Sequence, residues 1–595
     1  MWPYYLLLLC IISTSSVVVA TVREIEIDLS VGVVNPDCYT EGYEVLLVNG
    51  QHPAPPIRVT KGDEVRITVR NAEDSNRETT IHYHGIFQIG TVEADGLPYV
   101  TQAPIPPGGT FQQNFRVIDQ TGTYFYHAHS SLQDDAIHGP FIVYETDEDW
   151  PSSDDDDNDD VYFSYKKLRE GPYEYDDERV LFFSEWWHQD QSDRLDYLLG
   201  TNYKGLTQSH SKLINGRTVY DPTILQDDVD DCDGYSVINV EPGKEYRLRI
   251  IGSTTFSTLG FSIAHHMLTI IEVDGELIEP YDTDFVQVAP GQRFSALLRA
   301  DQPPESYYIA TKSYFTGDPN SNALAILRYN NDRYEKRGYT GDSGKQQANK
   351  PTIFEPCSTS QALVRDMPYL PDEEDAHPRG WLFPDFRPVS PVDHDFYSPP
   401  DRTIVLTPVE QEMPDGTTRW IINNHMPPHW RPSLLENLQH MNHRTVNRTA
   451  VDMNWHGYSD GYDEGHQTYP LEVGEVVDFV IQSTILSGNN KACAAHPWHT
   501  HGMVHYALAN GIGEYIHELD CDIRTYSTPI AQDTTLVYPA PRIGLPSGSP
   551  CSWVKIRLLV TNPGLWGFHC HITSHMLQGM MTVLEVSPER IPILQ

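Results

Sequence analysis

The sequence has few basic side chains for its length. Its 595 residues include 41 lysines and arginines against 83 aspartates and glutamates, so the formal net charge is −42 with neutral histidines. Binding to nucleic acid or to an anionic membrane surface depends on basic side chains that attract phosphate groups. The composition therefore argues against both as partners.

Long apolar runs are missing beyond the first twenty residues. Leu6–Ile12 is apolar, and residues 18–20 resemble a cleavage site, so we predict a signal peptide over residues 1–20 and a secreted chain. A membrane anchor is the alternative, but Ser13–Ser16 interrupt the run. Later in the chain no stretch approaches the roughly 18 apolar residues of a transmembrane helix, so we expect no membrane span in the mature chain.

Cysteine is also scarce. Of the eight cysteines, Cys10 is removed with the signal peptide, which leaves seven. An odd number predicts that one cysteine is free or binds a ligand. The sequence contains a single glycosylation sequon, at Asn447.

Short segments of alternating apolar and polar residues recur along the chain. Arg23–Leu29, Glu64–Arg70 and Tyr246–Ile250 have the period of a half-buried strand. Such runs lie between Gly, Pro and Asp turn signals, and long amphipathic helical stripes are rare. This pattern predicts an all-β protein built from β-sandwiches.

Two breaks in composition divide the chain into three blocks. The first contains the acidic run Asp154–Asp160, which we interpret as a solvated linker, with a metal-binding loop as the alternative. The second, residues 331–400, is rich in Pro, Asp, Lys and Gly and is predicted to be a linker that follows the surface. We therefore expect domains over residues 21–150, 161–330 and 401–590.

Four short clusters near the two ends of the chain contain histidine pairs of the form H-x-H. Residues i and i+2 of a strand project to the same face, about 6.5 Å apart, so each pair can bind two neighbouring metal ions. The pairs are His82/His84, His127/His129, His499/His501 and His569/His571. Together they predict a multinuclear metal cluster.

The last cluster also contains a thiolate. Cys570 lies between two histidines and must point to the opposite face of its strand. With His575 and His496 it forms a His2Cys set, and Met580 adds a thioether, which are the ligands of a blue-copper centre. Such a centre explains the odd cysteine. Zinc is an alternative metal, but structural zinc needs four ligands and eleven strong candidates are present.

The four clusters, in this order, resemble those of the multicopper oxidases, in the branch of laccases, ascorbate oxidases and fungal ferroxidases. The resemblance extends over about residues 22–590. The resemblance implies three cupredoxin-like Greek-key β-sandwich domains and four copper ions, with type 1 copper in the third domain and a trinuclear cluster between the first and third. It implies that type 1 copper is bound by His496, Cys570 and His575 with Met580 axial. It implies that type 2 copper is bound by His82 and His499. It implies that the type 3 pair is bound by His84, His127, His129, His501, His569 and His571.

Within the family, the sequence is most similar to ascorbate oxidase. Ser184–Gln189 and Glu272–Gly275 resemble two of its stretches. Trp420 matches a tryptophan that lines the ascorbate pocket, with a buried core role as the alternative. Asp95 matches an acidic residue near the trinuclear cluster, with a structural role as the alternative.

Three positions depart from the family pattern. No tryptophan is found near Lys204–Leu206, where a second pocket tryptophan is expected. Met503 replaces a histidine, and Thr573 replaces an acidic residue, which leaves one proton-relay assignment open.

The disulfide pattern is partly assigned by the resemblance. It implies a bridge between Cys38 and Cys232. Cys357, Cys493, Cys521 and Cys551 allow three pairings, which the sequence does not separate.

The resemblance implies an enzyme that couples four one-electron oxidations of a small reductant, ascorbate or a phenol, to the reduction of O2 to two waters. We expect the electrons to be accepted through His496, with Asp95 assisting proton delivery. Fe2+ is the alternative substrate, because the net negative charge of the chain would attract a cation. Copper binding without turnover is a second alternative. A tyrosinase-like enzyme also uses paired histidines but has no need of Cys570 between two of them.

Overall fold

The computed structural model describes residues 21–592, except 40–41, 152–166, 222–233, 316–321, 331–365, 373–382, 393, 427–429, 441–460, 488–491 and 541–543. The predicted signal peptide, the acidic run, Asn447, Cys232 and Cys357 lie outside these residues.

The first domain consists of two four-stranded sheets. One has the order β2-β1-β4-β6, with β1 (Val22–Val34), β2 (Tyr43–Val48), β4 (Glu64–Asn71) and β6 (Thr110–Arg116). The other has the order β3-β8-β7-β5, with β3 (Ile57–Thr60), β5 (Ile81–His84), β7 (Gly122–Ala128) and β8 (His138–Tyr144). The predicted alternation is seen in β4, where Val65, Ile67 and Val69 are completely buried and contribute to the core of this domain.

The second domain contains a six-stranded and a five-stranded sheet. The first has the order β12-β11-β14-β19-β16-β17, with β11 (Asp177–Trp186), β12 (Ser211–Ile214), β14 (Glu245–Gly252), β16 (Leu268–Val273), β17 (Glu276–Thr283) and β19 (Arg293–Arg299). The second has the order β13-β21-β20-β15-β18, with β13 (Ser236–Val240), β15 (Thr258–Ile263), β18 (Val286–Val288), β20 (Ser306–Tyr314) and β21 (Leu324–Tyr329). A short hairpin of β9 (Leu168–Glu170) and β10 (Tyr173–Tyr175) precedes them.

Strand β14 corrects one sequence expectation. The alternation of Tyr246–Ile250 predicted one exposed face, yet Arg247 and Arg249 are completely buried. Each pairs with a buried carboxylate, Arg247 with Glu272 and Arg249 with Glu178. Arg249 also donates to Thr123 Oγ1 of the first domain, at 2.9 Å. The polar face of β14 is therefore covered by another domain rather than by water.

The third domain contains two five-stranded sheets. One has the order β22-β26-β31-β28-β29, with β22 (Arg402–Leu406), β26 (Val476–Thr484), β28 (His505–Ile512), β29 (Ala531–Gln532) and β31 (Pro550–Leu559). The other has the order β25-β33-β32-β27-β30, with β25 (Tyr469–Leu471), β27 (His496–Thr500), β30 (Thr534–Val537), β32 (Gly564–Cys570) and β33 (Met581–Val586). A hairpin of β23 (Pro408–Glu412) and β24 (Thr418–Ile422) completes the domain.

The α-helices of the described residues are short. They are α1 (Gln191–Leu199), α4 (Leu434–His440), α6 (His517–Asp520) and α7 (Thr573–Leu577). The Asp190 side chain caps α1 by accepting from the Ser192 N–H.

One strand topology is repeated three times. In the first sheet of each domain an early strand lies parallel to a later one, in the pairs β1/β4, β11/β14 and β22/β26. The second sheets repeat this with β3/β8, β13/β21 and β25/β33. Parallel neighbours cannot be joined by a tight hairpin, so each pair requires the chain to cross over between the sheets. The three sandwiches therefore share one architecture.

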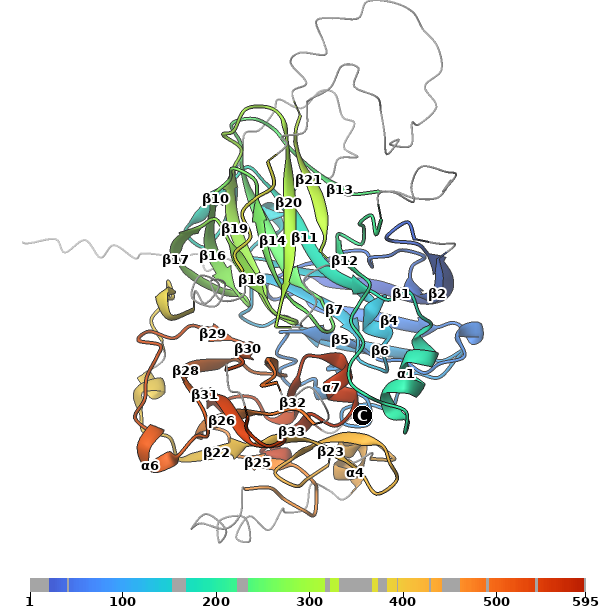
Figure 1. Ribbon diagram of the computed structural model, residues 1–595, viewed down its shortest axis with the longest axis vertical. Helices are drawn as coiled ribbons and strands as arrows, with labels where there is room; N and C mark the ends of the chain where they lie inside the picture. Colours follow the sequence, from blue (N-terminus) through green and yellow to red (C-terminus); the bar gives the residue numbers. More distant parts are fainter. Residues whose placement is uncertain are drawn as a thin grey trace, which may run out of the picture.

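The predicted linker is anchored by aromatic side chains. Among its described residues, Phe383 and Phe386 belong to the buried core of the second domain, and Phe396 packs in the third. Figure 1 shows the second domain (green) beside both others, while the strands of the first domain (blue) approach those of the third (orange to red). The histidine-bearing strands β5, β7, β27 and β32 lie at this junction.

Candidate metal centres

Strand pairing brings the histidine pairs together within each domain. In the first domain β5 pairs with β7, which places His82 opposite His127. In the third domain β27 pairs with β32, which places His499 opposite His569. All eight histidines of the four pairs are buried, with exposures of 5% or less.

The two domains then bring these pairs into one cluster. The rings of His82 and His501 stack with centroids 4.0 Å apart, and those of His84 and His499 stack at 3.7 Å. Sets of three buried ligand atoms lie within 4.8 Å of one another, among them His82/His499/His501 and His129/His501/His569. His571 approaches His84, with 3.2 Å between Nε2 and Nδ1. The structure therefore gathers all eight predicted residues between the first and third domains.

Hydrogen bonds fix the tautomers of four of these histidines. A backbone carbonyl only accepts, so a ring nitrogen bonded to it carries the proton and the other nitrogen keeps a lone pair. Nδ1 donates to such carbonyls in His82 (2.7 Å), His127 (2.9 Å), His499 (3.0 Å) and His569 (3.0 Å). Their Nε2 lone pairs are free to bind a metal.

Several ring nitrogens of the cluster have no hydrogen-bond partner although they are buried. A buried polar atom without a partner costs about 1–3 kcal/mol, so such atoms indicate a missing ligand. They are His82 Nε2, His127 Nε2, His129 Nδ1 and Nε2, His499 Nε2 and His571 Nδ1. Burial lowers the pKa of His569 to about 3 and of His499 to about 4, which keeps both in the neutral form that metal ions require.

Asp95 supports two of the ligands. It is completely buried, its carbonyl accepts from His82, and its Oδ2 lies 2.9 Å from His501 Nδ1. Burial alone would raise the pKa of Asp95, but the His501 and His82 imidazoles lower it below its usual value. The carboxylate therefore accepts from His501 Nδ1, and His501 Nε2 faces His569 Nε2 at 3.0 Å with lone pairs on both atoms. Two acceptors at this distance need a cation between them, so the residues fit a metal.

A second supporting carboxylate, Asp533, was missed by the sequence analysis. Its Oδ1 lies 3.1 Å from His84 Nε2, and its backbone carbonyl accepts from His499. Burial would raise the pKa of Asp533, but Arg293 and His84 lower it well below its usual value. Arg293 of β19 donates to both carboxylate oxygens at 2.6 Å, so the second domain also reaches the cluster. No local motif surrounds Asp533, and only contacts across three domains reveal its role.

The predicted His2Cys set is assembled on the other side of β32. Cys570 Sγ lies 3.7 Å from Nδ1 of both His496 and His575, and the three ligand atoms lie within 4.8 Å of one another. Met580 is completely buried, and its carbonyl accepts from the Cys570 N–H at 3.0 Å. The neighbours of Cys570 in sequence, His569 and His571, belong to the eight-histidine cluster. One stretch of backbone therefore joins the two centres.

The two histidines of this set differ slightly in exposure. His496 is completely buried and its Nε2 has no partner, whereas His575 keeps 4% of its surface exposed. Of the predicted ligands in this set, His575 is therefore the one with the most exposed surface, while entry of electrons through His496 stays a prediction. Trp420 is completely buried, with ring centroids 5.4 Å from His496 and 5.0 Å from His575. The structure places Trp420 against the ligands, as the core alternative describes.

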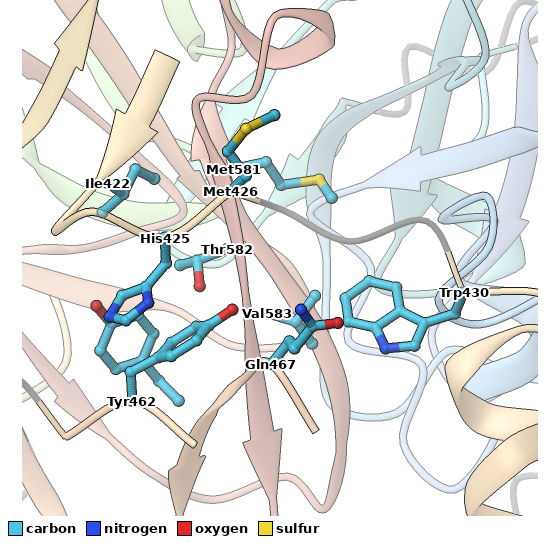
Figure 2. A pocket seen from close by; sticks show the side chains of 10 residues that line it. Ile422, His425, Met426, Trp430, Tyr462, Gln467, Met581, Thr582 and Val583 are labelled. Atoms are coloured by element: carbon cyan, nitrogen blue, oxygen red, sulfur yellow. The ribbon is translucent and has the colours of Figure 1, made fainter. Parts of the chain in front are cut away.

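Two hollows lie near these centres. One is lined by residues of the histidine cluster together with Ser131, Asp134, Thr573 and Met576. The other is shown in Figure 2 and is lined by His425, Met426, Trp430, Tyr462 and Met581, among others. Each has room for about one water molecule, with a volume of about 10 Å³. None of the residues that line the second hollow is a predicted metal ligand.

The cysteines are arranged differently from the expectation. Cys493 and Cys551 form a disulfide, which excludes the two pairings that join either of them to Cys357 or Cys521. Within the described residues Cys521 is free, and Cys357, its partner in the remaining pairing, lies outside them. Cys38 is disulfide-bonded, and its predicted partner Cys232 lies outside the described residues.

Comparison with known proteins identifies the class. Models of the multicopper oxidase family match residues 29–148, 177–332 and 427–590. An L-ascorbate oxidase of Brassica rapa subsp. pekinensis is 29% identical and covers 96% of this chain and 93% of its own. The laccase-like multicopper oxidase 1 of Thermothelomyces thermophilus is 30% identical and covers 93% of this chain and 86% of its own. The crystal structure of Fet3p, a multicopper oxidase that functions in iron import, has a TM-score of 0.69 at 25% identity and covers 96% of this chain and 93% of that one.

Fold and site together define a copper-dependent oxidoreductase of cupredoxin-like domains that uses O2 as the acceptor. The chain belongs to the multicopper oxidase family, whose members bind four copper ions, and the histidine clusters described above fit such sites. No helix in the described part of the chain has both the length and the apolar character needed to cross a membrane.

Proposed function

We propose that the protein is a secreted oxidase of a small organic reductant, ascorbate or a phenol, and that His575 is the copper ligand nearest to the bound reductant. The observation that carries this proposal is the His2Cys set, in which only His575 keeps contact with solvent. Copper bound at the two centres supplies one-electron redox chemistry that couples oxidation of the reductant to reduction of O2 to water.

The proposed ligand assignment follows the two clusters. His496, Cys570, His575 and Met580 would hold type 1 copper, and His82 and His499 would hold type 2 copper. The type 3 pair would be held by His84, His127, His129, His501, His569 and His571. The fixed Nδ1 protons and the lone pairs that face one another support this assignment.

The protein side chains around these ligands orient them. Asp95 holds His82 and His501, and Asp533 holds His84 and His499, each through a ring nitrogen that is then unavailable to metal. Trp420 packs against both imidazoles of the His2Cys set. These contacts hold the ligand side chains in fixed positions. The side chains then move little when an electron is gained or lost.

The surroundings of His575 favour an organic reductant over Fe2+. Among the described residues, no carboxylate pairs with His496 or His575, and the pKa of His575 is lowered by burial and by His496. Helix α7, which carries His575, packs instead through Leu577 against a cluster containing Leu198 and Tyr203 of the second domain. Binding of Fe2+ in proteins often includes a carboxylate oxygen, and none is paired with either histidine of the set within the described part of the chain. The relatives named L-ascorbate oxidase and laccase-like multicopper oxidase agree with this choice.

An oxygen electrode separates the candidate functions. The copper-loaded protein should consume O2 with ascorbate or a methoxyphenol and should not do so with Fe2+. Faster consumption with Fe2+ than with either organic reductant would establish a ferroxidase, and no consumption with any of them would indicate copper storage.

Substitution of the two free cysteines provides a matched pair. Cys570→Ser should abolish the intense blue absorption and O2 consumption, because serine lacks the thiolate. Cys521→Ser, at the other free cysteine, should change neither. Retention of the blue absorption in Cys570→Ser would refute the assignment.

Secretion is supported by the apolar start of the sequence and by the Cys493–Cys551 disulfide, since disulfides persist in oxidising compartments. The N-terminal sequence of protein recovered from the culture medium should begin near Thr21. Protein retained by cells with residues 1–20 intact would contradict this proposal.

A further inference from the structure

A buried carboxyl group that the proposed function does not use lies beside the eight-histidine cluster. Asp134 follows the second histidine pair in the turn Gln133–Asp135, and it is 6% exposed. It lines the small hollow described above together with His129 and His571. The position of Asp134 therefore places a carboxyl group in the wall of the compartment where O2 is reduced.

The contacts of Asp134 leave one oxygen available. Oδ2 accepts a hydrogen bond from the Thr573 hydroxyl, which comes from α7 of the third domain. Oδ1 is buried and has no hydrogen-bond partner. Asp134 also accepts through its backbone carbonyl from His138 Nδ1, at 2.6 Å, which holds the turn in place. The carboxyl is thus oriented by Thr573 while Oδ1 remains free.

The charges around the turn favour a proton on Asp134. Its neighbour Asp135 pairs with Arg194 at 2.5 Å and accepts from Thr255, so the nearby cation is already engaged. Burial and then the negative charge of Asp135 raise the pKa of Asp134 well above its usual value, although Thr573 and Arg194 oppose this. His138, on the other side, has its pKa lowered by burial to about 3 and is neutral.

Reduction of O2 to two waters consumes four protons as well as four electrons. The reductant supplies the electrons at the other centre, so the protons must reach the buried compartment separately. The hollow is also lined by Ser131 and Met576, which are partly exposed at the surface.

We propose that Asp134 is the proton donor for O2 reduction, oriented by Thr573 and reprotonated from solvent along the hollow beside Ser131. In each transfer the Asp134 O–H bond breaks, the proton passes to oxygen that is being reduced by electrons from the reductant, and the carboxylate takes a proton from water. Four such transfers account for the four protons of two waters. This inference rests on the proposed oxidase function.

The test measures reoxidation of the reduced protein by O2 separately from its reduction by the organic substrate. Copper-loaded wild type and Asp134→Asn are reduced anaerobically with dithionite and mixed with O2 in a stopped-flow instrument, and the return of the blue absorption is followed. Loss of a general acid typically lowers a reaction rate by about 10²–10⁴-fold. We therefore expect reoxidation of Asp134→Asn to be about a hundredfold slower than that of wild type. Asp134→Glu, which keeps a carboxyl, should recover most of this loss, and Asp193→Asn on the exposed side of α1 should match wild type.

Anaerobic reduction by ascorbate or a phenol is measured on the same variants and should be unchanged in Asp134→Asn. Failure of wild type to be reduced by either reductant would overturn the proposed substrate but not the role of Asp134, because dithionite reduction does not need the substrate site. Reoxidation of Asp134→Asn within twofold of wild type, or equal slowing in Asp134→Asn and Asp134→Glu, would overturn the proton-donor proposal.

Infrared spectroscopy of the copper-free protein gives an independent readout. The spectrum of wild type minus that of Asp134→Asn should contain the carbonyl-stretch band of a protonated carboxyl, and this band should be shifted in Thr573→Val. If wild type and Asp134→Asn show the same bands, Asp134 holds no proton and the proposal fails.

Discussion

At the scale of single residues, the proposed copper ligands are held in place by specific contacts with their neighbours. Trp420 is an example, because its ring packs against His496 and His575 while its backbone N–H donates to the Gln578 carbonyl at 2.9 Å. A residue in this position affects both stability and the properties of the copper centre.

We expect Trp420→Ala to lower the free energy of unfolding by about 3–5 kcal/mol, because truncation of a completely buried tryptophan leaves a cavity. The blue absorption should shift or weaken as the two imidazoles move, whereas Trp420→Phe should retain it. Chemical denaturation and absorption spectra test this. A stable Trp420→Ala protein with only a raised KM would instead favour the role in substrate binding.

A second residue-scale prediction concerns pH. His466 lies 3.0 Å from the completely buried Glu585, and the hydrogen bond to Glu585 raises the pKa of His466 above its usual value. A histidine with a raised folded-state pKa contributes stability below its unfolded pKa and loses this contribution as the pH rises through the folded value.

His466→Gln should therefore destabilise the protein more at pH 5 than at pH 9. Thermal unfolding of both proteins at the two pH values measures the difference. An equal loss of stability at both values would show that the charge of His466 contributes nothing.

At the scale of elements, strand β5 is held by the turn that follows Asp95. Gly96 has φ +83°, and a Cβ at this position would lie 1.9 Å from the carbonyl oxygen of Ile81 in β5. This close approach of two backbone segments allows the Asp95 carbonyl to reach His82.

Gly96→Ala should displace β5 and lower the copper content of the trinuclear site while the blue absorption from the third domain remains. Gly90→Ala is the matched control, since Gly90 has φ +74° but nothing lies within 4 Å of an added Cβ. Metal analysis and absorption spectra measure the outcome. Equal copper loss in both variants would show that backbone strain alone causes the loss and that the close contact with Ile81 does not contribute.

At the scale of the whole molecule, the second domain supports a site to which it gives none of the predicted ligands. Arg293 donates to both Asp533 oxygens of the third domain and to the Thr123 carbonyl of the first, at 3.2 Å. The three sandwiches thus meet at one buried guanidinium.

Arg293→Met should lower the free energy of unfolding by about 3–5 kcal/mol, because it leaves the Asp533 carboxylate buried without its cation. The double variant Arg293→Met/Asp533→Asn should lose less stability than the sum of the losses in the two single variants. Arg299→Met, at a side chain that is 71% exposed, should stay within about 0.5 kcal/mol of wild type. Denaturation curves of the four variants test this, and strictly additive losses would refute the coupling.

Much of this molecule was predictable because its chemistry depends on local spacing. The H-x-H pairs and Cys570 lie on strands, where the two-residue period alone decides which side chains share a face. The alternation in β4 likewise predicted its buried side. The same reasoning was wrong for β14, because Arg247 and Arg249 are covered by carboxylates and a neighbouring domain, and alternation does not distinguish such a cover from water.

The all-β character, the class of chemistry and the candidate ligand types were predictable from the sequence, since they follow from residue identity and short-range periodicity. Tertiary structure decided that His575 rather than His496 lies nearest to solvent, that Cys521 stays free, and that Asp533, Arg293 and Asp134 surround the cluster. These roles depend on burial and on contacts between residues hundreds of positions apart, and the packing of the three domains alone creates them.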